Sequence, residues 1–101
     1  KAANLPPYGR FVSIIMSSKD KYLLEKFSSS LKQSAPNYEN IIVLGPAPAP
    51  VVYLRGKFRY RFLIKSSKEI NIQKVIKNWL KNIKIPSYIK LTIDIEPYSF
   101  L

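Results

Sequence analysis

The feature that most constrains the fold is the alternation of apolar and basic side chains from Lys57 to Lys65. The apolar positions are Phe58, Tyr60, Phe62 and Ile64, and the basic positions are Lys57, Arg59, Arg61 and Lys65. Successive side chains of a β-strand point to opposite faces of the sheet. The run therefore predicts a strand with one face against a core and a basic face left open.

Apolar periodicity predicts further elements on both sides of this strand. A β-branched run predicts a strand over residues 10–17, and a helix then extends to Ala35 from a capping box formed by Ser17 and Asp20. Residues 41–44 predict a short second strand, and residues 51–54 favour another brief one. The alternating prolines between them favour a stiff extended linker that cannot join a central ladder.

The second half of the chain repeats the helix-then-strand pattern. Ser66 and Glu69 form a second possible capping box, and an apolar stripe from Ile72 to Ile83 predicts a helix of three turns. Residues 89–96 alternate again and predict a last strand, which ends at Pro97.

The order strand, helix, strand, strand, helix, strand predicts an α+β fold. Its type is the ferredoxin-like split βαβ arrangement (βαββαβ), an antiparallel sheet with two helices on one face. Right-handed crossovers place the first and third strands in the centre. A chain of 101 residues with 47% apolar residues supports one core. We expect residues 1–8 to be a linker that leads into a single domain, residues 9–101.

Several functional classes are excluded by what the sequence lacks. Cysteine and histidine are absent, which removes disulfides, thiolate metal sites and the commonest general base. Asp94 and Glu96 are interpreted as surface acids, and no Walker-type or dinucleotide loop is present. We therefore predict no catalytic residue, metal or cofactor. Without a membrane-spanning run or signal peptide, we expect a cytoplasmic domain that does not bind membranes.

The net charge of +11 implies an anionic partner, such as nucleic acid, a membrane surface or an acidic protein segment. Strand alternation places the basic side chains of residues 57–65 in a row about 7 Å apart, comparable with phosphate spacing. Solvated side chains, or pairs with Asp94 and Glu96, are the alternative. Residues 55–62 are similar to an RNA-recognition signature shifted by one position, which turns the aromatic rings toward the helices and disfavours base stacking.

A second basic surface is predicted on the helix that begins near residue 72. Lys74, Lys77, Lys81 and Lys84 lie opposite its apolar stripe. Such a stripe is commonly a solvated face. The alternative is a shelf for phosphate or for an acidic peptide, strengthened by the open start of the helix around Lys68.

Three segments make the chain recognisable in combination: residues 5–10 (Leu-Pro-Pro-Tyr-Gly-Arg), residues 44–61 with the Gly-Pro-Ala-Pro-Ala-Pro run, and residues 94–101. Over essentially the whole chain, their order and spacing resemble the carboxy-terminal domain of the PriA (primosomal protein N′) family of bacterial replication-restart DNA helicases. The resemblance implies a non-catalytic piece of an ATP-dependent 3′–5′ helicase, with the ATP and zinc sites upstream. The resemblance maps the family's Arg-Gly-basic-aromatic-Arg-Tyr segment onto residues 55–60. Together with the basic row, this gives the predicted DNA-binding residues: Arg55, Lys57, Arg59, Arg61 and Lys65.

The resemblance also implies protein partners. They are the upstream helicase domains and single-stranded-DNA-binding protein, whose acidic tail would bind near the second helix. The resemblance maps the start of the family's second helix onto residues 69–73. With the basic side chains around it, the predicted interaction residues are Lys68, Gln73, Lys74 and Lys77. Gln73 suits tail binding, whereas Glu69 stands where an acidic peptide favours a basic residue. A third possibility is that residues 98–101 pack against the upstream domains and that this domain braces the helicase core.

Overall fold

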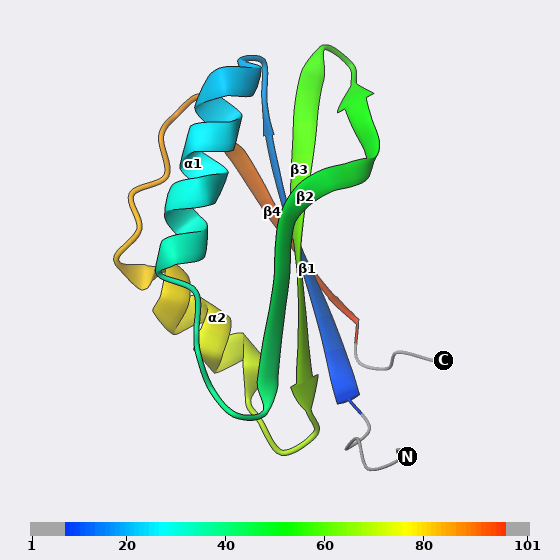
Figure 1. The fold of residues 1–101 in the computed structure, drawn as a ribbon, viewed down its shortest axis with the longest axis vertical. Coiled ribbons are helices and arrows are strands. Elements are labelled where there is room, and N and C mark those ends of the chain that lie inside the picture. The colour runs from blue at the N-terminus through cyan, green and yellow to red at the C-terminus, as the bar shows by residue number, and fades with distance from the viewer. Residues whose placement is uncertain (1–7, 97–101) are drawn as a thin grey trace.

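The computed structural model describes residues 8–96. Its elements are β1 (Tyr8–Ser18), α1 (Lys21–Gln33), β2 (Ile41–Leu54), β3 (Lys57–Ser67), α2 (Ile72–Lys81) and β4 (Lys90–Glu96). All strand pairs are antiparallel in the order β2-β3-β1-β4, and both helices lie on one side of the sheet (Figure 1). The ferredoxin-like α+β prediction is confirmed, with β1 and β3 in the centre. The predicted linker lies almost wholly outside the described residues, and Tyr8 already belongs to β1.

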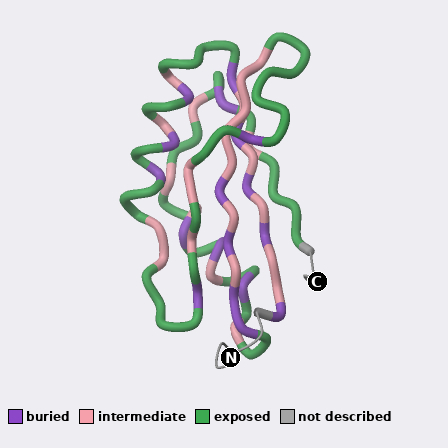
Figure 2. The backbone as a smooth tube through the Cα atoms, turned by 45° about the vertical axis from the view of Figure 1, so that its right-hand side comes forward, coloured by how far each residue is buried: buried purple, intermediate pink, exposed green. Residues whose placement is uncertain are grey.

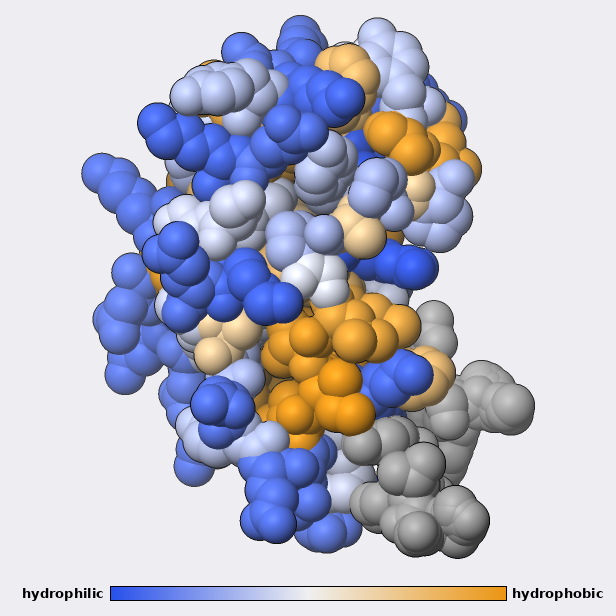
Figure 3. Space-filling model, viewed as in Figure 1, coloured by the Kyte–Doolittle hydropathy of each residue, from blue (hydrophilic) through white to orange (hydrophobic). Residues whose placement is uncertain are grey.

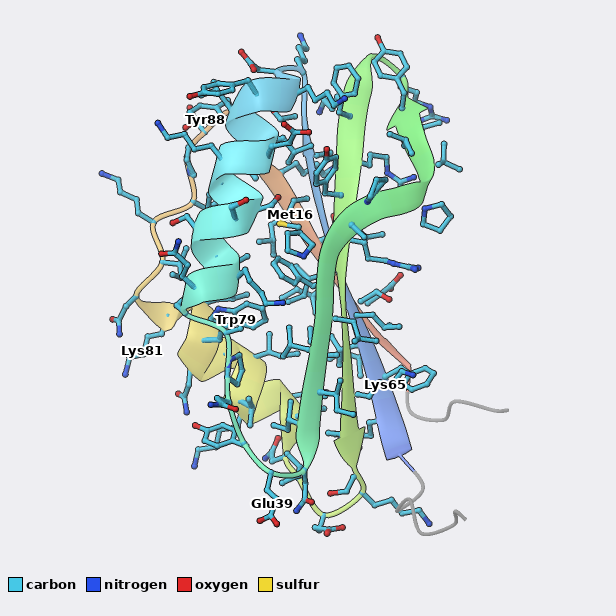
Figure 4. All side chains as sticks on the ribbon, viewed as in Figure 1. Met16, Glu39, Lys65, Trp79, Lys81 and Tyr88 are labelled. Carbon is cyan, nitrogen blue, oxygen red and sulfur yellow. The ribbon has the colours of Figure 1, made fainter. Side chains whose placement is uncertain are left out.

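The core lies between the helices and the inner face of β1 and β3. Val12 pairs with Ile64 and Ile14 pairs with Phe62, and all four side chains are fully buried. Buried positions alternate along these strands (Figure 2). The Trp79 ring packs edge-on against Phe62, with 5.4 Å between ring centroids. Figure 4 shows Met16 and Trp79 between helices and sheet, and Lys65 on the opposite side of the sheet.

Both predicted capping boxes are wrong. The Asp20 side chain caps α1 by accepting from the Leu23 N–H at 3.0 Å. For α2 the cap is Asn71, whose side chain accepts from the Lys74 N–H at 3.1 Å. Strand β3 continues through Ser66, which pairs with β1 and is fully buried, so its hydroxyl cannot reach the helix start.

The prediction of two short strands joined by a proline linker is also wrong, because β2 is one continuous strand. Its register against β3 shifts twice, between Leu44 and Ala47 and between Pro48 and Tyr53. Prolines are tolerated at edge strands and bulges, where no ladder hydrogen bond is lost, and β2 is an edge strand. The Lys32 ammonium of α1 donates to the Gly45 carbonyl at 2.8 Å and holds the first irregularity against the helix.

Candidate nucleic-acid interface

The sheet face opposite the helices carries the predicted basic row. Lys57, Arg59, Arg61 and Lys65 are all half-buried there. The register of β1 with its two neighbours sets Ser17 between Arg59 and Lys90, and Ile15 between Arg61 and Thr92. Residues of three strands therefore meet in rows across this face. The alternation of β3 and β4 orients these side chains, whereas pairing of distant segments brings them together.

A groove of about 540 Å³ is formed at one end of this face. Ile15 and Ser17 of β1 line it between the two outer walls. Its other lining residues are Leu54 and Arg55 at the β2–β3 turn, Lys57 and Arg59 of β3, and Lys90, Thr92 and Asp94 of β4. Among the predicted DNA-binding residues, Arg55, Lys57 and Arg59 thus share one groove.

Arg61 and Lys65 do not line this groove. Lys65 lies at the other end of the face, with its ammonium 5.3 Å from the centroid of the Phe11 ring. Arg61 pairs with Ala47 of β2 on one side and with Ile15 of β1 on the other. The sequence-based site missed Lys90, although the alternation of residues 89–96 had placed that side chain on the basic face. Strand order was needed to show that β4 closes the groove.

The turn that brings Arg55 to the groove is strained. Arg55 and Gly56 connect β2 to β3 with φ angles of 53° and 80°. Two consecutive positive φ values characterise the tight hairpin turn that matches strand twist, and its first position favours Asn, Asp or Gly. An arginine in this conformation is uncommon, and such residues concentrate at ligand clamps. Arg55 is therefore a strong candidate for contact with a ligand.

Arg59 is held in place by the irregular part of β2. Its Nη1 donates to the Val51 carbonyl oxygen at 3.0 Å, within the second register shift of that strand. This bond uses one of the five N–H donors of the guanidinium, and the others can bind a ligand. The groove walls carry four cationic side chains and one carboxylate, that of Asp94. Such a concave basic wall attracts anions more strongly than scattered surface charges.

The other end of the open face carries exposed apolar side chains beside Lys65. Figure 3 shows an apolar patch over the lower half of β2 as drawn in Figure 1, where Ile42 and Leu44 are 37% and 45% exposed. Their partners on β3 are Lys65 and Leu63. The open face is thus divided into a basic end and an apolar end.

The second predicted site lies on the helix side of the molecule. A cleft of about 370 Å³ between α2 and β4 is lined by Ile76, Leu80, Ile93 and Ile95, together with Gln73, Lys77 and Lys81. Lys74 lines a neighbouring hollow that also includes Gln73 and Lys77. Lys68 instead lies over Gly9 at the start of β1. The structure therefore brings together Gln73, Lys74 and Lys77, and it separates Lys68 from them.

Residues 8–96 contain no group of three or more acidic, cysteine or histidine side chains arranged to hold a metal ion. Neither α1 nor α2, the helices of this part of the chain, is long and apolar enough to cross a membrane.

Comparison with known proteins places these features in a family. The sequence profile described as "Primosomal protein N C-terminal domain" matches residues 1–98. "Replication restart protein PriA" of Rickettsia typhi is 43% identical over 100 residues, covering 99% of this chain and 15% of that protein. The Rickettsia prowazekii protein of the same name is also 43% identical with the same coverage, and the Bacillus subtilis one is 24% identical, covering 95% of this chain and 12% of its own length. The chain thus spans less than one-sixth of the relatives that it matches.

Among solved structures, the C-terminal DNA-binding domain of the MHV-68 latency-associated nuclear antigen gives a TM-score of 0.46 at 18% identity. It covers 95% of this chain and 80% of that domain. A likeness this weak carries no conclusion about fold or function.

Proposed function

Since the chain belongs to the primosomal protein N C-terminal domain family, we propose that it is the non-catalytic C-terminal domain of a replication-restart DNA helicase and contributes DNA binding at stalled forks. The observation that carries the proposal is the groove on the open sheet face, where Arg55, Lys57, Arg59 and Lys90 converge. Four cations in one concave wall suit phosphate groups of a nucleic-acid backbone.

The physical basis of this binding is electrostatic. Lys57 and Arg59 are half-buried, so salt screens their charges less than those of fully exposed side chains. Contacts to phosphates position the protein without reading sequence. This suits a domain that must act wherever a fork has stalled. The helicase reaction, with its ATP and zinc, belongs in this proposal to the upstream part of the parent protein, in the bacterial cytoplasm.

The test is titration of fluorescently labelled single-stranded and forked DNA with the domain at low and high salt. Arg55→Asn is the most informative variant, because Asn is favoured in this turn and the hairpin is kept. We expect Arg55→Asn and Lys57→Gln each to weaken binding about fivefold to tenfold, and high salt to weaken it further. Lys84→Gln removes the same charge outside the groove and serves as the control. Binding that ignores salt, or that treats all three variants alike, would contradict the proposal.

We propose a second function for the cleft between α2 and β4, namely capture of the acidic tail of single-stranded-DNA-binding protein. The supporting observation is that Ile93 and Ile95 remain 40% and 39% exposed beside Lys77 and Lys81. An apolar cleft bordered by ammonium groups suits a peptide that carries both apolar and acidic side chains. The upstream helicase domains are the third proposed partner.

Calorimetric titration with the acidic tail peptide tests this second function. Gln73→Ala and Lys77→Glu should each weaken peptide binding about tenfold, whereas Lys84→Glu should change it little. Peptide binding that is unaffected by Gln73→Ala and Lys77→Glu would remove α2 as the site.

A further inference from the structure

The groove on the open sheet face is more complex than phosphate binding requires. Its Arg55, Lys57 and Arg59 side is cationic, while the β4 side carries Lys90 and also the hydrogen-bond acceptors of Thr92 and Asp94. Two apolar side chains, Ile15 and Leu54, also line it, and Leu54 is 44% exposed. The groove therefore has three chemically different parts.

We propose that this groove seats one unpaired nucleotide of single-stranded DNA. Its phosphate lies against Arg55 and Lys57, and its base covers Ile15 and Leu54. The proposal rests on the DNA-binding function and extends it, because it selects single strands over duplex and adds a base contact to the phosphate contacts.

The β4 side of the groove, which carries Asp94 as well as Lys90, supports a bound base. A carboxylate repels phosphate, so Asp94 weakens a site that holds phosphates alone. The same carboxylate accepts hydrogen bonds from base amino groups such as cytosine N4. Asp94 pairs with Ser13 of β1, whereas Arg59 pairs with Ser17 of the same strand. A base edge at Asp94 therefore leaves the phosphate free to lie toward the cations near Ser17.

The apolar side chains support the same conclusion. Exposed Leu54 and half-buried Ile15 gain from contact with the face of a base, because apolar surface is then removed from water. The guanidinium of Arg59, which donates to the Val51 carbonyl oxygen, offers a planar surface on which a base can stack. The aromatic rings of β3 face the helices, as the sequence had predicted, so these groups replace the aromatic platform that single-strand binders commonly use.

The size of the groove suits a single nucleotide. At about 540 Å³ it falls within the range of small-ligand pockets. A base within a duplex is paired and stacked, so it cannot reach Ile15 unless it is flipped out. An unpaired strand presents its bases without that cost.

The test compares three labelled ligands of equal length, titrated into the full chain at matched salt: oligo-dC, an abasic oligonucleotide with the same phosphates, and duplex DNA. We expect oligo-dC to bind at least about tenfold more tightly than the abasic strand, as a stacked base provides. Equal affinity for oligo-dC and the abasic strand would overturn the inference and leave phosphate binding intact. Absence of binding to all three ligands would overturn the proposed function, and this inference with it.

Two variants separate the base contact from the phosphate contact. Leu54→Ser at an exposed position should remove most of the advantage of oligo-dC over the abasic strand. Arg55→Asn should lower the affinity for both the oligo-dC and the abasic strand by a similar factor. If Leu54→Ser leaves the ratio of the two affinities unchanged while its circular dichroism matches that of the parent chain, the inference is wrong.

Discussion

Two glycines show how surroundings determine the role of a single residue. Gly45 and Gly56 both have positive φ angles, 115° and 80°. A Cβ on Gly45 would lie 2.6 Å from the Arg61 carbonyl oxygen, whereas a Cβ on Gly56 would meet nothing within 4 Å. Gly45 is therefore required both by backbone conformation and by the close approach of β3, and Gly56 by conformation alone.

We expect Gly45→Ala to lower the free energy of unfolding by about 3 kcal/mol, because conformational strain and a backbone clash add together. Gly56→Ala is its matched control and should cost about 1 kcal/mol. Urea unfolding followed by the fluorescence of Trp79, the single tryptophan, measures both values. Similar losses for the two variants would contradict the role of the β3 contact.

Tyr60 provides a prediction about pH. Its phenol donates a hydrogen bond to the Glu25 carboxylate of α1. That bond, then burial, then the negative charge of Glu25, raises the pKa of Tyr60 above its ordinary value of 10.0. Because the pKa is raised in the folded state, the neutral phenol contributes stability below the unfolded pKa, and this contribution is lost as pH rises through the folded pKa.

Ultraviolet titration of phenolate formation should show one tyrosine that ionises above the ordinary range. Tyr60→Phe should remove that late step and make unfolding stability less dependent on pH in this alkaline range. Tyr38→Phe, at an exposed position, should leave the late step in place. A late step that persists in Tyr60→Phe would assign it to another residue.

At the scale of elements, a helix can begin only after the preceding strand has stopped pairing in the sheet. Because β3 extends to Ser67, the backbone is still in the sheet at Ser66, and α2 begins only after Asn71. The edge position of β2 likewise permits a single strand through the proline run. Local signals for caps and breaks were present in the sequence, but the length of the neighbouring strand determined which signal was used.

The two possible caps of α2 can be separated by mutation. Asn71→Ala should lower the free energy of unfolding by about 1 kcal/mol, because it leaves the Lys74 N–H without its partner. Glu69→Ala should change it by less than about 0.5 kcal/mol, as expected for an exposed surface position. Chemical denaturation of both variants is the measurement. A larger loss of unfolding free energy in Glu69→Ala than in Asn71→Ala would support the capping box.

For the whole molecule, the main consequence of the fold is the separation of surfaces. The basic groove occupies the open face of the sheet, and the apolar cleft beside α2 occupies the helix side. The two proposed ligands, DNA and an acidic peptide, would therefore not compete for one surface. The net charge of +11 is spread more widely than either site, so salt dependence distinguishes groove binding from general attraction.

If the four cations of the groove provide the phosphate contacts, the logarithm of single-strand affinity should fall with the logarithm of salt concentration with a slope of about −3. Arg55→Asn combined with Lys57→Gln should flatten the slope by about 1.4. Lys84→Gln should leave it unchanged. A much steeper slope that ignores the double substitution would indicate binding over the whole basic surface.

Periodicity determined the direction of most side chains, because direction within a strand or helix depends only on local geometry. It therefore predicted the order of the elements and the shared face of Lys57, Arg59, Arg61 and Lys65. The central place of β1 and β3 followed from the right-handed crossover rule. The family resemblance, rather than periodicity, suggested DNA as the ligand. Binding by these residues stays a prediction.

Tertiary structure determined which residues line the groove. Lys90, Thr92 and Asp94 reach the same hollow as Arg55 and Arg59 because β1 pairs with strands from both halves of the chain. The bulges of β2 place the Val51 carbonyl beside Arg59, and no local pattern encodes that contact. The basic and apolar alternation from Lys57 to Lys65 thus determined which side chains face outward. Only the pairing of distant strands determined which of these side chains line the same groove, since register depends on the packing of the whole sheet.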